Sequence, residues 1–169
     1  MPAYIGTFTK ILFASLRLAY VVLPSGVVES TISARAALDR FPPRFMQDAV
    51  ADLIADGTLT AHVRRVRSRY REARDAVVAE LKSSAGESLI FAAPDQGLHL
   101  LLRLPRDHPK GMAMRIRDAA CVECRLLSET RLVQRGADGF ILGFSGYEIG
   151  ELKSAARRLG LAARDHQRR

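Results

Sequence analysis

The sequence has only two cysteines and no long apolar run. Its longest apolar stretch, residues 16–24, is interrupted by Arg17 and is far shorter than the roughly 20 residues that a membrane-spanning helix needs. The first residues also lack the basic and small-residue regions of a secretory signal. We therefore expect no membrane span and a cytoplasmic location.

The two cysteines, Cys121 and Cys124, form a single C-x-x-C motif. This motif is typical of a redox pair or of half a zinc site, but no second cysteine pair or His-x-His partner accompanies it. A redox motif would open a helix after a strand, whereas Cys121 is expected to end a helix over residues 112–120 and Cys124 to enter a strand. We predict reduced, partly buried thiols and no metal site.

Acidic residues are few, because 18 Asp and Glu stand against 26 Lys and Arg and give a formal charge of +8. A basic excess is typical of proteins that bind nucleic acid. Part of it falls on one predicted helix, at Arg64, Arg65, Arg67, Arg69, Arg71 and Arg74. Glu72 lies among these arginines, and Asp75 and Glu80 follow them. This mixture of charges favours a solvated helix face with local ion pairs.

The composition, 48% apolar and 26% charged, is that of a globular protein, and 169 residues are enough for one domain or slightly more. Apolar periodicity and turn residues predict an α/β fold. The expected strands are 3–8, 16–23, 89–91, 98–104, 123–127 and 140–144, and the expected helices are 27–41, 43–55, 58–82, 112–120 and 147–161, followed by a frayed basic tail over 164–169.

The connection between the first two strands carries Lys10. A lysine that forms a Schiff base needs a preformed, dry pocket in which nearby cations make its amine nucleophilic. Thr7 and Thr9 place hydroxyl groups beside it, and Arg17, seven residues on, offers planar donors that suit a phosphate. An amine with a phosphate-binding arginine indicates a phosphorylated aldehyde cofactor. The alternative is an exposed lysine at a strand end.

Arg17 and His99 are expected inside apolar strands. In a buried strand Arg17 needs a partner to offset its desolvation, which a phosphate would supply better than a surface carboxylate. A lone histidine in an apolar strand is more often a hydrogen-bonded core residue than an acid or base, so His99 is not expected to be catalytic.

The lysine segment resembles the cofactor-lysine segment of fold type I aminotransferases, and most closely that of the aminotransferase-like domain of MocR (GntR-type) regulators. The matching residues are Gly6-Thr-Phe-Thr-Lys10-Ile-Leu-Phe-Ala-Ser-Leu-Arg17-Leu-Ala-Tyr20. Thr9, Ile11, Ala14 and Ala19 depart from the usual residues, while the spacing of Lys10 and Arg17 is intact. Residues 54–67, 96–104 and 140–146 extend the resemblance, in order, along nearly the whole chain.

The resemblance implies the C-terminal part of a fold type I transferase that depends on pyridoxal 5'-phosphate. Residues 1–57 would end the large cofactor-binding domain, and residues 58–169 would form the connecting helix and small α/β domain. It implies Lys10 as the catalytic Schiff-base lysine and Arg17, Thr7 and Thr9 as further cofactor-binding residues. For a substrate carboxylate the position aligned within residues 140–142 has no arginine, which leaves Arg131 or Arg135 as substitutes.

Three functions follow from this resemblance. The first is a transaminase acting on an amino acid or amine, in which Lys10 also moves the α-proton. The second is the ligand-sensing domain of a regulator without turnover, in which DNA would be bound only by an N-terminal domain that this sequence does not contain. The third is an inactive fragment, because the acid that pairs with the pyridine nitrogen is expected further upstream and the first acid here is Glu29. A homodimer is expected for the complete protein.

Overall fold

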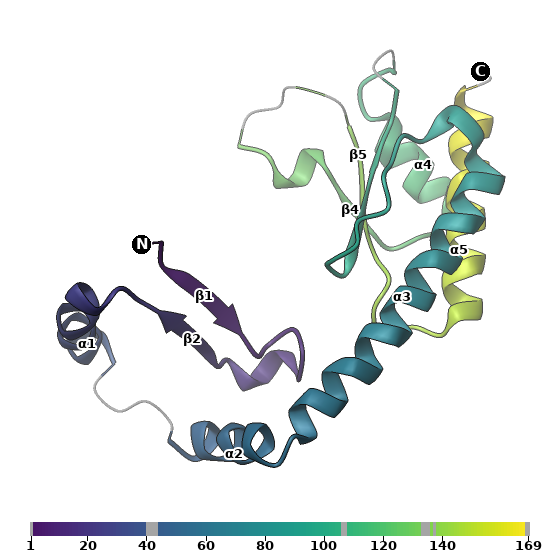
Figure 1. Ribbon diagram of the computed structural model, residues 1–169. Helices are drawn as coiled ribbons and strands as arrows, with labels where there is room; N and C mark the ends of the chain where they lie inside the picture. Colours follow the sequence, from purple (N-terminus) through teal and green to yellow (C-terminus); the bar gives the residue numbers. More distant parts are fainter. Residues whose placement is uncertain (1, 40–43, 106–107, 133–135, 137, 168–169) are drawn as a thin grey trace. The chain divides into compact units, whose positions relative to one another are not determined.

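The structure is a computed structural model that describes residues 2–39, 44–105, 108–132, 136 and 138–167 (Figure 1). It divides into two compact units, residues 1–67 and 68–169, and the division falls inside the long helix α3, Thr58–Ala85. The boundary expected after residue 57 divides the large and small domains of the fold that the sequence resembles, and it stays a prediction. No helix among the described residues is long and apolar enough to cross a membrane.

The first unit begins with a two-stranded antiparallel ribbon. Strand β1, Tyr4–Thr7, pairs with β2, Ala19–Val22, and a short 3-10 helix, Ala14–Leu16, lies in the connection between them. The ribbon places Gly6 opposite Tyr20, and a Cβ on Gly6 would collide with the Tyr20 ring. A side chain at position 6 would therefore have to displace the Tyr20 ring that covers Gly6.

Two helices complete the first unit before α3. Helix α1 runs over Ser25–Leu38 and α2 over Arg44–Ala55. Residues 40–43, where the first of the two predicted helices ends and the second begins, lie outside the described part of the chain. Gly57, at a φ of 79°, turns the chain from α2 into α3, as the Asp56-Gly57 pair predicts. At the start of α3 the Asp56 carboxylate accepts a hydrogen bond from the Thr58 amide at 2.8 Å.

The first unit buries few apolar side chains. Among its described residues only Leu16, Val50 and Leu59 are buried apolar side chains, whereas Ile5 is 72% exposed and Leu38 is 90% exposed. All four residues of β2 are exposed, so the prediction of a buried strand over residues 16–23 is wrong. Its apolar residues remain exposed in a ribbon of only two strands.

The second unit is a three-stranded antiparallel sheet with helices. Strand β5, Gly139–Gly143, is central, with β3, His99–Arg103, on one side and β4, Arg125–Leu126, on the other. Helix α4, Met112–Ala120, packs on α5, Ile149–Gln167, which in turn lies against the end of α3 (Figure 1). The hydrophobic core lies wholly in this unit and includes Phe140 and Phe144.

Three predictions are wrong in the second unit. The expected strand over residues 89–91 is a single bridge between Ile90 and Arg103. Residues 164–167, expected as frayed tail, continue α5 because Ala163 is still buried and extends its apolar stripe. His99 is exposed, because β3 alternates and its buried face is taken by Leu100 and Leu102.

Candidate cofactor-binding loop

The loop between β1 and β2 holds a tight turn that carries Lys10. Its two ends are joined by a hydrogen bond from the Phe8 amide to the Leu18 carbonyl at 3.0 Å. The carbonyl of Phe8 then accepts hydrogen bonds from the amides of Ile11, at 3.1 Å, and Leu12, at 2.9 Å. Lys10 therefore lies in a turn whose backbone is held, as expected of a connection between strands.

Lys10 and Arg17 both present their charges to solvent. Both side chains are exposed, and neither forms a hydrogen bond or ion pair with any described residue. Arg17 follows the 3-10 helix in a left-handed conformation, with φ at 51°, and precedes β2. The prediction that Arg17 lies in a buried strand is thus wrong, because Leu16 alone turns inward there.

Thr7 and Thr9 stabilise the loop itself. The Thr7 hydroxyl donates to the Leu18 carbonyl at 3.3 Å and accepts from the Thr9 amide at 3.2 Å. A hydroxyl has a single proton to donate, so Thr7 would have to give up Leu18 in order to donate to another acceptor. Thr9 contributes its backbone amide to this arrangement. The cofactor contacts expected from both threonine side chains stay predictions.

Aromatic rings cover one face of the ribbon beside the loop. The Tyr20 ring centroid lies 5.5 Å from that of Phe8 and 6.1 Å from that of Tyr4, in tilted arrangements. Interaction with Tyr4 raises the pKa of the Tyr20 hydroxyl above its ordinary value. The ring of Tyr20 thus remains a neutral phenol well above physiological pH.

One contact that the sequence did not indicate ties the loop to α3. The Nε2 atom of His62 lies 2.8 Å from the carbonyl oxygen of Ile11, the residue after Lys10. The two residues are 51 positions apart, and both are half-buried. In the sequence His62 belongs only to the segment of family resemblance over residues 54–67, since neither helical periodicity nor motif spacing relates it to Lys10.

The two candidate substrate-binding arginines belong to the second unit. Arg131 follows the 3-10 helix Ser128–Thr130, is half-buried and points its guanidinium toward Gly136. Arg135 lies outside the described residues. Substrate binding by either arginine stays a prediction.

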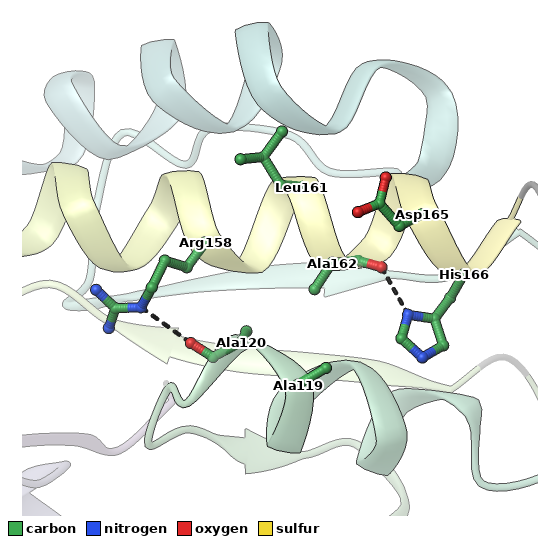
Figure 2. Close-up of a pocket in the computed structure, with 7 residues that line it drawn as sticks. All are labelled: Ala119, Ala120, Arg158, Leu161, Ala162, Asp165 and His166. Atoms are coloured by element: carbon green, nitrogen blue, oxygen red, sulfur yellow. Dashed lines mark hydrogen bonds between the residues drawn. The ribbon is translucent and has the colours of Figure 1, made fainter.

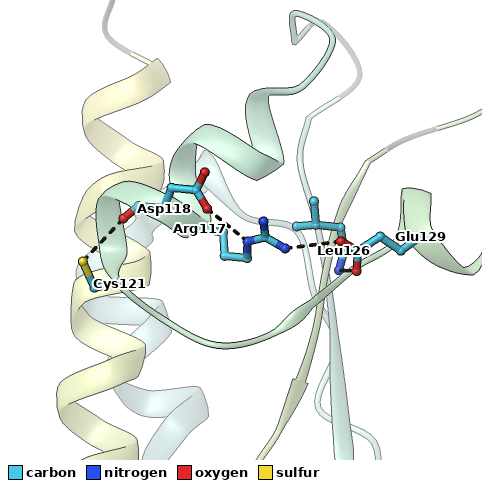
Figure 3. A network of polar contacts seen from close by, with 5 residues as sticks. All are labelled: Arg117, Asp118, Cys121, Leu126 and Glu129. Atoms are coloured by element: carbon cyan, nitrogen blue, oxygen red, sulfur yellow. Dashed lines mark hydrogen bonds and ion pairs between the residues drawn. The ribbon is translucent and has the colours of Figure 1, made fainter.

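A polar network lies around the C-x-x-C motif (Figure 3). Arg117 pairs with Asp118 at 3.2 Å and with Glu129 at 3.3 Å, and Glu129 also accepts the Leu126 amide at 3.0 Å. These contacts connect α4 to β4 and to the 3-10 helix that follows it. Cys121 ends α4 and Cys124 directly precedes β4, and both thiols are free. Among the described residues no group of three or more potential metal ligands gathers.

A shallow depression of about 360 Å³ lies between α4 and α5 (Figure 2). It is lined by three alanines, Leu161 and the polar side chains of Arg158, Asp165 and His166. Arg158 donates to the carbonyls of Ala120, at 2.9 Å, and Cys121, at 3.4 Å. A guanidinium at these carbonyls stabilises the C-terminal end of α4, so Arg158 acts there as a helix-capping side chain.

The arginines of α3 are mostly solvated. Arg69 pairs with Glu148 at 2.9 Å, and Arg74 pairs with Asp75 at 2.8 Å and donates to the Pro94 carbonyl. Glu72 and Glu80 form no ion pair with a described residue. The Arg74–Asp75 pair is one of the expected local ion pairs. The other two partners, Glu148 and the Pro94 carbonyl, lie outside α3, so the expected local pairs form only in part.

Comparison with known proteins relates the whole arrangement to aminotransferases. A search of protein-family models finds no match. The structure aligns with kynurenine aminotransferase from Pyrococcus horikoshii, solved with PMP, at a TM-score of 0.85 and 22% identity over 96% of this chain and 40% of that one. It also aligns with the α-aminoadipate aminotransferase LysN from Thermus thermophilus, complexed with N-(5'-phosphopyridoxyl)-L-leucine. That alignment has a TM-score of 0.83 and 23% identity, and it covers 98% of this chain and 42% of that one.

These alignments define the class of the chain, whose α/β fold is that of fold type I, pyridoxal-phosphate-dependent aminotransferases. Its sequence relatives are MocR/GntR-type regulators and aminotransferases. The chain is 29% identical to a probable rhizopine catabolism regulatory protein MocR of Rhizobium meliloti over 86% of its length, and 27% identical to a 2-aminoadipate transaminase of Thermus thermophilus over 61%. It spans 29% of that regulator and 26% of that transaminase.

Proposed function

We propose that this aminotransferase-like domain binds pyridoxal phosphate through its Lys10 loop. The observation that carries the proposal is that one hydrogen-bonded loop carries two exposed cations, Lys10 and Arg17, neither of which has a hydrogen-bond or ion-pair partner among the described residues. An unpartnered amine suits an aldehyde, and an unpartnered guanidinium suits a phosphate. The relatives and the solved aminotransferases are consistent with this choice of group.

The residues present fit two parts of the cofactor. The amine of Lys10 would hold its aldehyde carbon, and Arg17, with the Thr7 hydroxyl once released from Leu18, would bind its phosphate. When bound, the cofactor supplies an electron-withdrawing ring that stabilises negative charge on an attached carbon. The Lys10 Nζ would take up and return the proton at the α-carbon of an amino acid or amine.

A third part of the cofactor, the pyridine nitrogen, has no partner near this loop in the sequence. The first acidic residue is Glu29, in the exposed helix α1. A carboxylate for that nitrogen would therefore come from a part of the sequence distant from this loop or from a partner chain. A homodimer, which we expect for the complete protein, is one source of such a group.

The test is reductive labelling of the purified chain. Protein is incubated with pyridoxal phosphate, treated with borohydride, and analysed by peptide mass spectrometry. We expect modification at Lys10 in preference to Lys82, Lys110 and Lys153, the other lysines of the sequence. Equal labelling of all four lysines would refute the proposal and support the reading of an inactive chain.

The role of Arg17 has its own test. Arg17→Gln is expected to slow labelling by pyridoxal phosphate roughly tenfold, since a hydrogen-bonded charge pair is worth about 1.5–3 kcal/mol before solvent screening. Labelling by pyridoxal, which has no phosphate, is expected to stay unchanged. Arg65→Gln, at an exposed arginine elsewhere in the unit, is the matched control. If Arg17→Gln lowers the labelling rate equally with both aldehydes, Arg17 does not bind the phosphate.

A second candidate function is the sensing of an amino acid or amine without turnover. It is favoured by the regulator of Rhizobium meliloti, which matches 86% of this chain. In that function DNA would be bound by a separate part of the protein. Amino acid added to the loaded protein separates the two candidates, because a transaminase releases a 2-oxo acid whereas a sensor changes its absorbance and releases none.

A further inference from the structure

We propose that His62 is a positioning residue for Lys10, acting through the carbonyl of Ile11. This inference rests on the proposed function, because it assigns His62 the task of holding the backbone from which the Lys10 amine projects. His62 itself touches neither the lysine side chain nor Arg17 in any recorded contact.

The contact has the length of a well-formed hydrogen bond. Its length is 2.8 Å, and both residues are half-buried, so water competes less than at an exposed site. A carbonyl oxygen can only accept, so Nε2 of His62 carries the proton and donates it. His62 lies between Leu59, which is buried, and Val63 and Val66, which are half-buried, so its helix face is directed inward.

The bond completes a set of restraints on the Lys10 backbone. On the side before Lys10, the Thr9 amide is bound to the Thr7 hydroxyl. After it, the amides of Ile11 and Leu12 are bound to Phe8, and the Ile11 carbonyl is bound to His62. The first restraints lie within the loop, and among the described residues of this unit only His62 forms a side-chain hydrogen bond between that loop and a helix. Lys10 thus has a fixed backbone and a free amine.

A fixed backbone favours reaction at the amine. Less conformational freedom has to be lost when Lys10 and Arg17 engage one ligand, which raises the rate of the covalent step. Without His62 the turn would still close on Phe8, but its far side would lose its connection to α3. The expected defect is local to residues 8–12.

The experiment compares three variants of the full chain. In glutamine, as in histidine, the Nε2 atom is separated from Cβ by the same number of bonds. His62→Gln is therefore expected to keep the hydrogen bond to the Ile11 carbonyl. His62→Asn is one bond too short, and His62→Ala has no donor. Labelling of Lys10 at saturating pyridoxal phosphate is expected to slow roughly three- to tenfold in the last two variants and to be restored in the first.

A second measurement does not depend on the cofactor. Amide hydrogen exchange at Ile11 and Leu12 is expected to quicken roughly three- to tenfold in His62→Asn and His62→Ala, and not in His62→Gln. His99→Ala, at an exposed histidine of the other unit, should change neither measurement. Equal exchange in all variants, or a His62→Gln variant that behaves like His62→Ala, would overturn the positioning role.

The two proposals fail in different ways. If the unsubstituted chain shows no preference for Lys10, the proposed cofactor is wrong, and hydrogen exchange still decides whether His62 holds the turn. If Lys10 is labelled preferentially and His62→Ala is labelled at the same rate as the unsubstituted chain, pyridoxal phosphate binds and the positioning role is wrong.

Discussion

Cys121 and Cys124 are three residues apart, yet their thiols lie in different surroundings. Cys121 is exposed at the end of α4, in a left-handed conformation with φ at 50°, and its thiol donates to the Asp118 carbonyl. Cys124 is half-buried against the core. Burial raises the pKa of Cys124 to about 11; nearby Arg117 opposes this effect and Glu129 adds to it.

We predict that Cys124 reacts slowly with alkylating reagents. A pKa near 11 in place of 9.0 leaves roughly a hundredfold less thiolate at pH 8, and thiolate is the reactive form. Iodoacetamide labelling of a Cys121→Ser variant, which retains only Cys124, is expected to be slow at pH 8 and to quicken up to about pH 11. Labelling of Cys124→Ser reports the exposed thiol as a control.

The same shift links Cys124 to stability. Its pKa is raised in the folded state, so its contribution to stability is fully present below about pH 9 and is lost as the pH rises toward 11. Urea unfolding at pH 8 and at pH 10.5 should show a smaller loss for Cys124→Ala than for the unsubstituted chain. An equal loss in the two proteins would contradict the assigned burial.

At the scale of secondary-structure elements, α3 and α5 approach each other closely at Gly160. Gly160 of α5 is buried, and a Cβ there would lie 2.9 Å from the backbone nitrogen of Ala85 and would collide with the Ser84 hydroxyl. Ser84 is itself buried and donates to the Glu80 carbonyl at 2.7 Å. The two helices can therefore pack at this distance only because residue 160 has no side chain.

We predict that Gly160→Ala destabilises the second unit by about 1–3 kcal/mol, the usual cost of overpacking, reduced by up to ~1 kcal/mol of helix propensity. Gly150→Ala is the matched control, because Gly150 is also in α5 and nothing lies within 4 Å of its Cβ position. That variant is expected to be neutral or slightly stabilising. Urea unfolding measures both, and equal stabilities would show that α3 and α5 are further apart.

The β1–β2 ribbon differs from the second unit's sheet in what covers it. Tyr4, Ile5, Val21 and Val22 are large apolar residues, and each is at least half exposed. A two-stranded ribbon is marginally stable in water on its own, and an uncovered edge is prone to pair with other strands. Its order therefore depends on the hydrogen bonds of the loop and on α3 through His62.

At the scale of the whole molecule, sequence periodicity predicted the helices better than the strands. The bounds of α4 match, and α3 continues only three residues beyond its predicted end, because apolar residues at spacings of three and four continue through both. Every predicted strand except that over residues 140–144 is longer than the observed one, since an apolar run does not reveal where pairing stops, whereas β5 has its predicted length with a shift of one residue. Leu16 ends the 3-10 helix, and Arg17 and Leu18 lie in the irregular segment before β2, so residues 16–18 are not part of a strand.

The candidate site was predicted in part. Lys10 lies in the connection between the two strands, as predicted, whereas Arg17, predicted inside the second strand, lies in that same connection. The exposure of Arg17 and the use of the Thr7 hydroxyl by Leu18 depend on the loop's hydrogen bonds, which no pattern of residue types encodes. The contact of His62 with Ile11 joins residues 51 positions apart and requires the folded arrangement.

The two units are expected to differ in protection from hydrogen exchange. The hydrophobic core lies wholly in residues 68–169, so amides of β3, β5 and α5 should exchange only on global opening of that unit. Amides of β1 and β2, in a ribbon with exposed apolar faces, should exchange much faster. Exchange on the intact chain, read by mass spectrometry, measures both units at once.

Pyridoxal phosphate then gives the last prediction. A ligand at 100 times its dissociation constant stabilises the state that it binds by about 2.7 kcal/mol, which slows exchange through opening of that state by up to about a hundredfold. Because Lys10 and Arg17 belong to the first unit, slowing is expected in residues 4–22 and not in β3 or β5. Lys10→Ala should abolish the effect. Equal slowing in both units would place the ligand elsewhere, and no slowing in either would leave the loop without a cofactor.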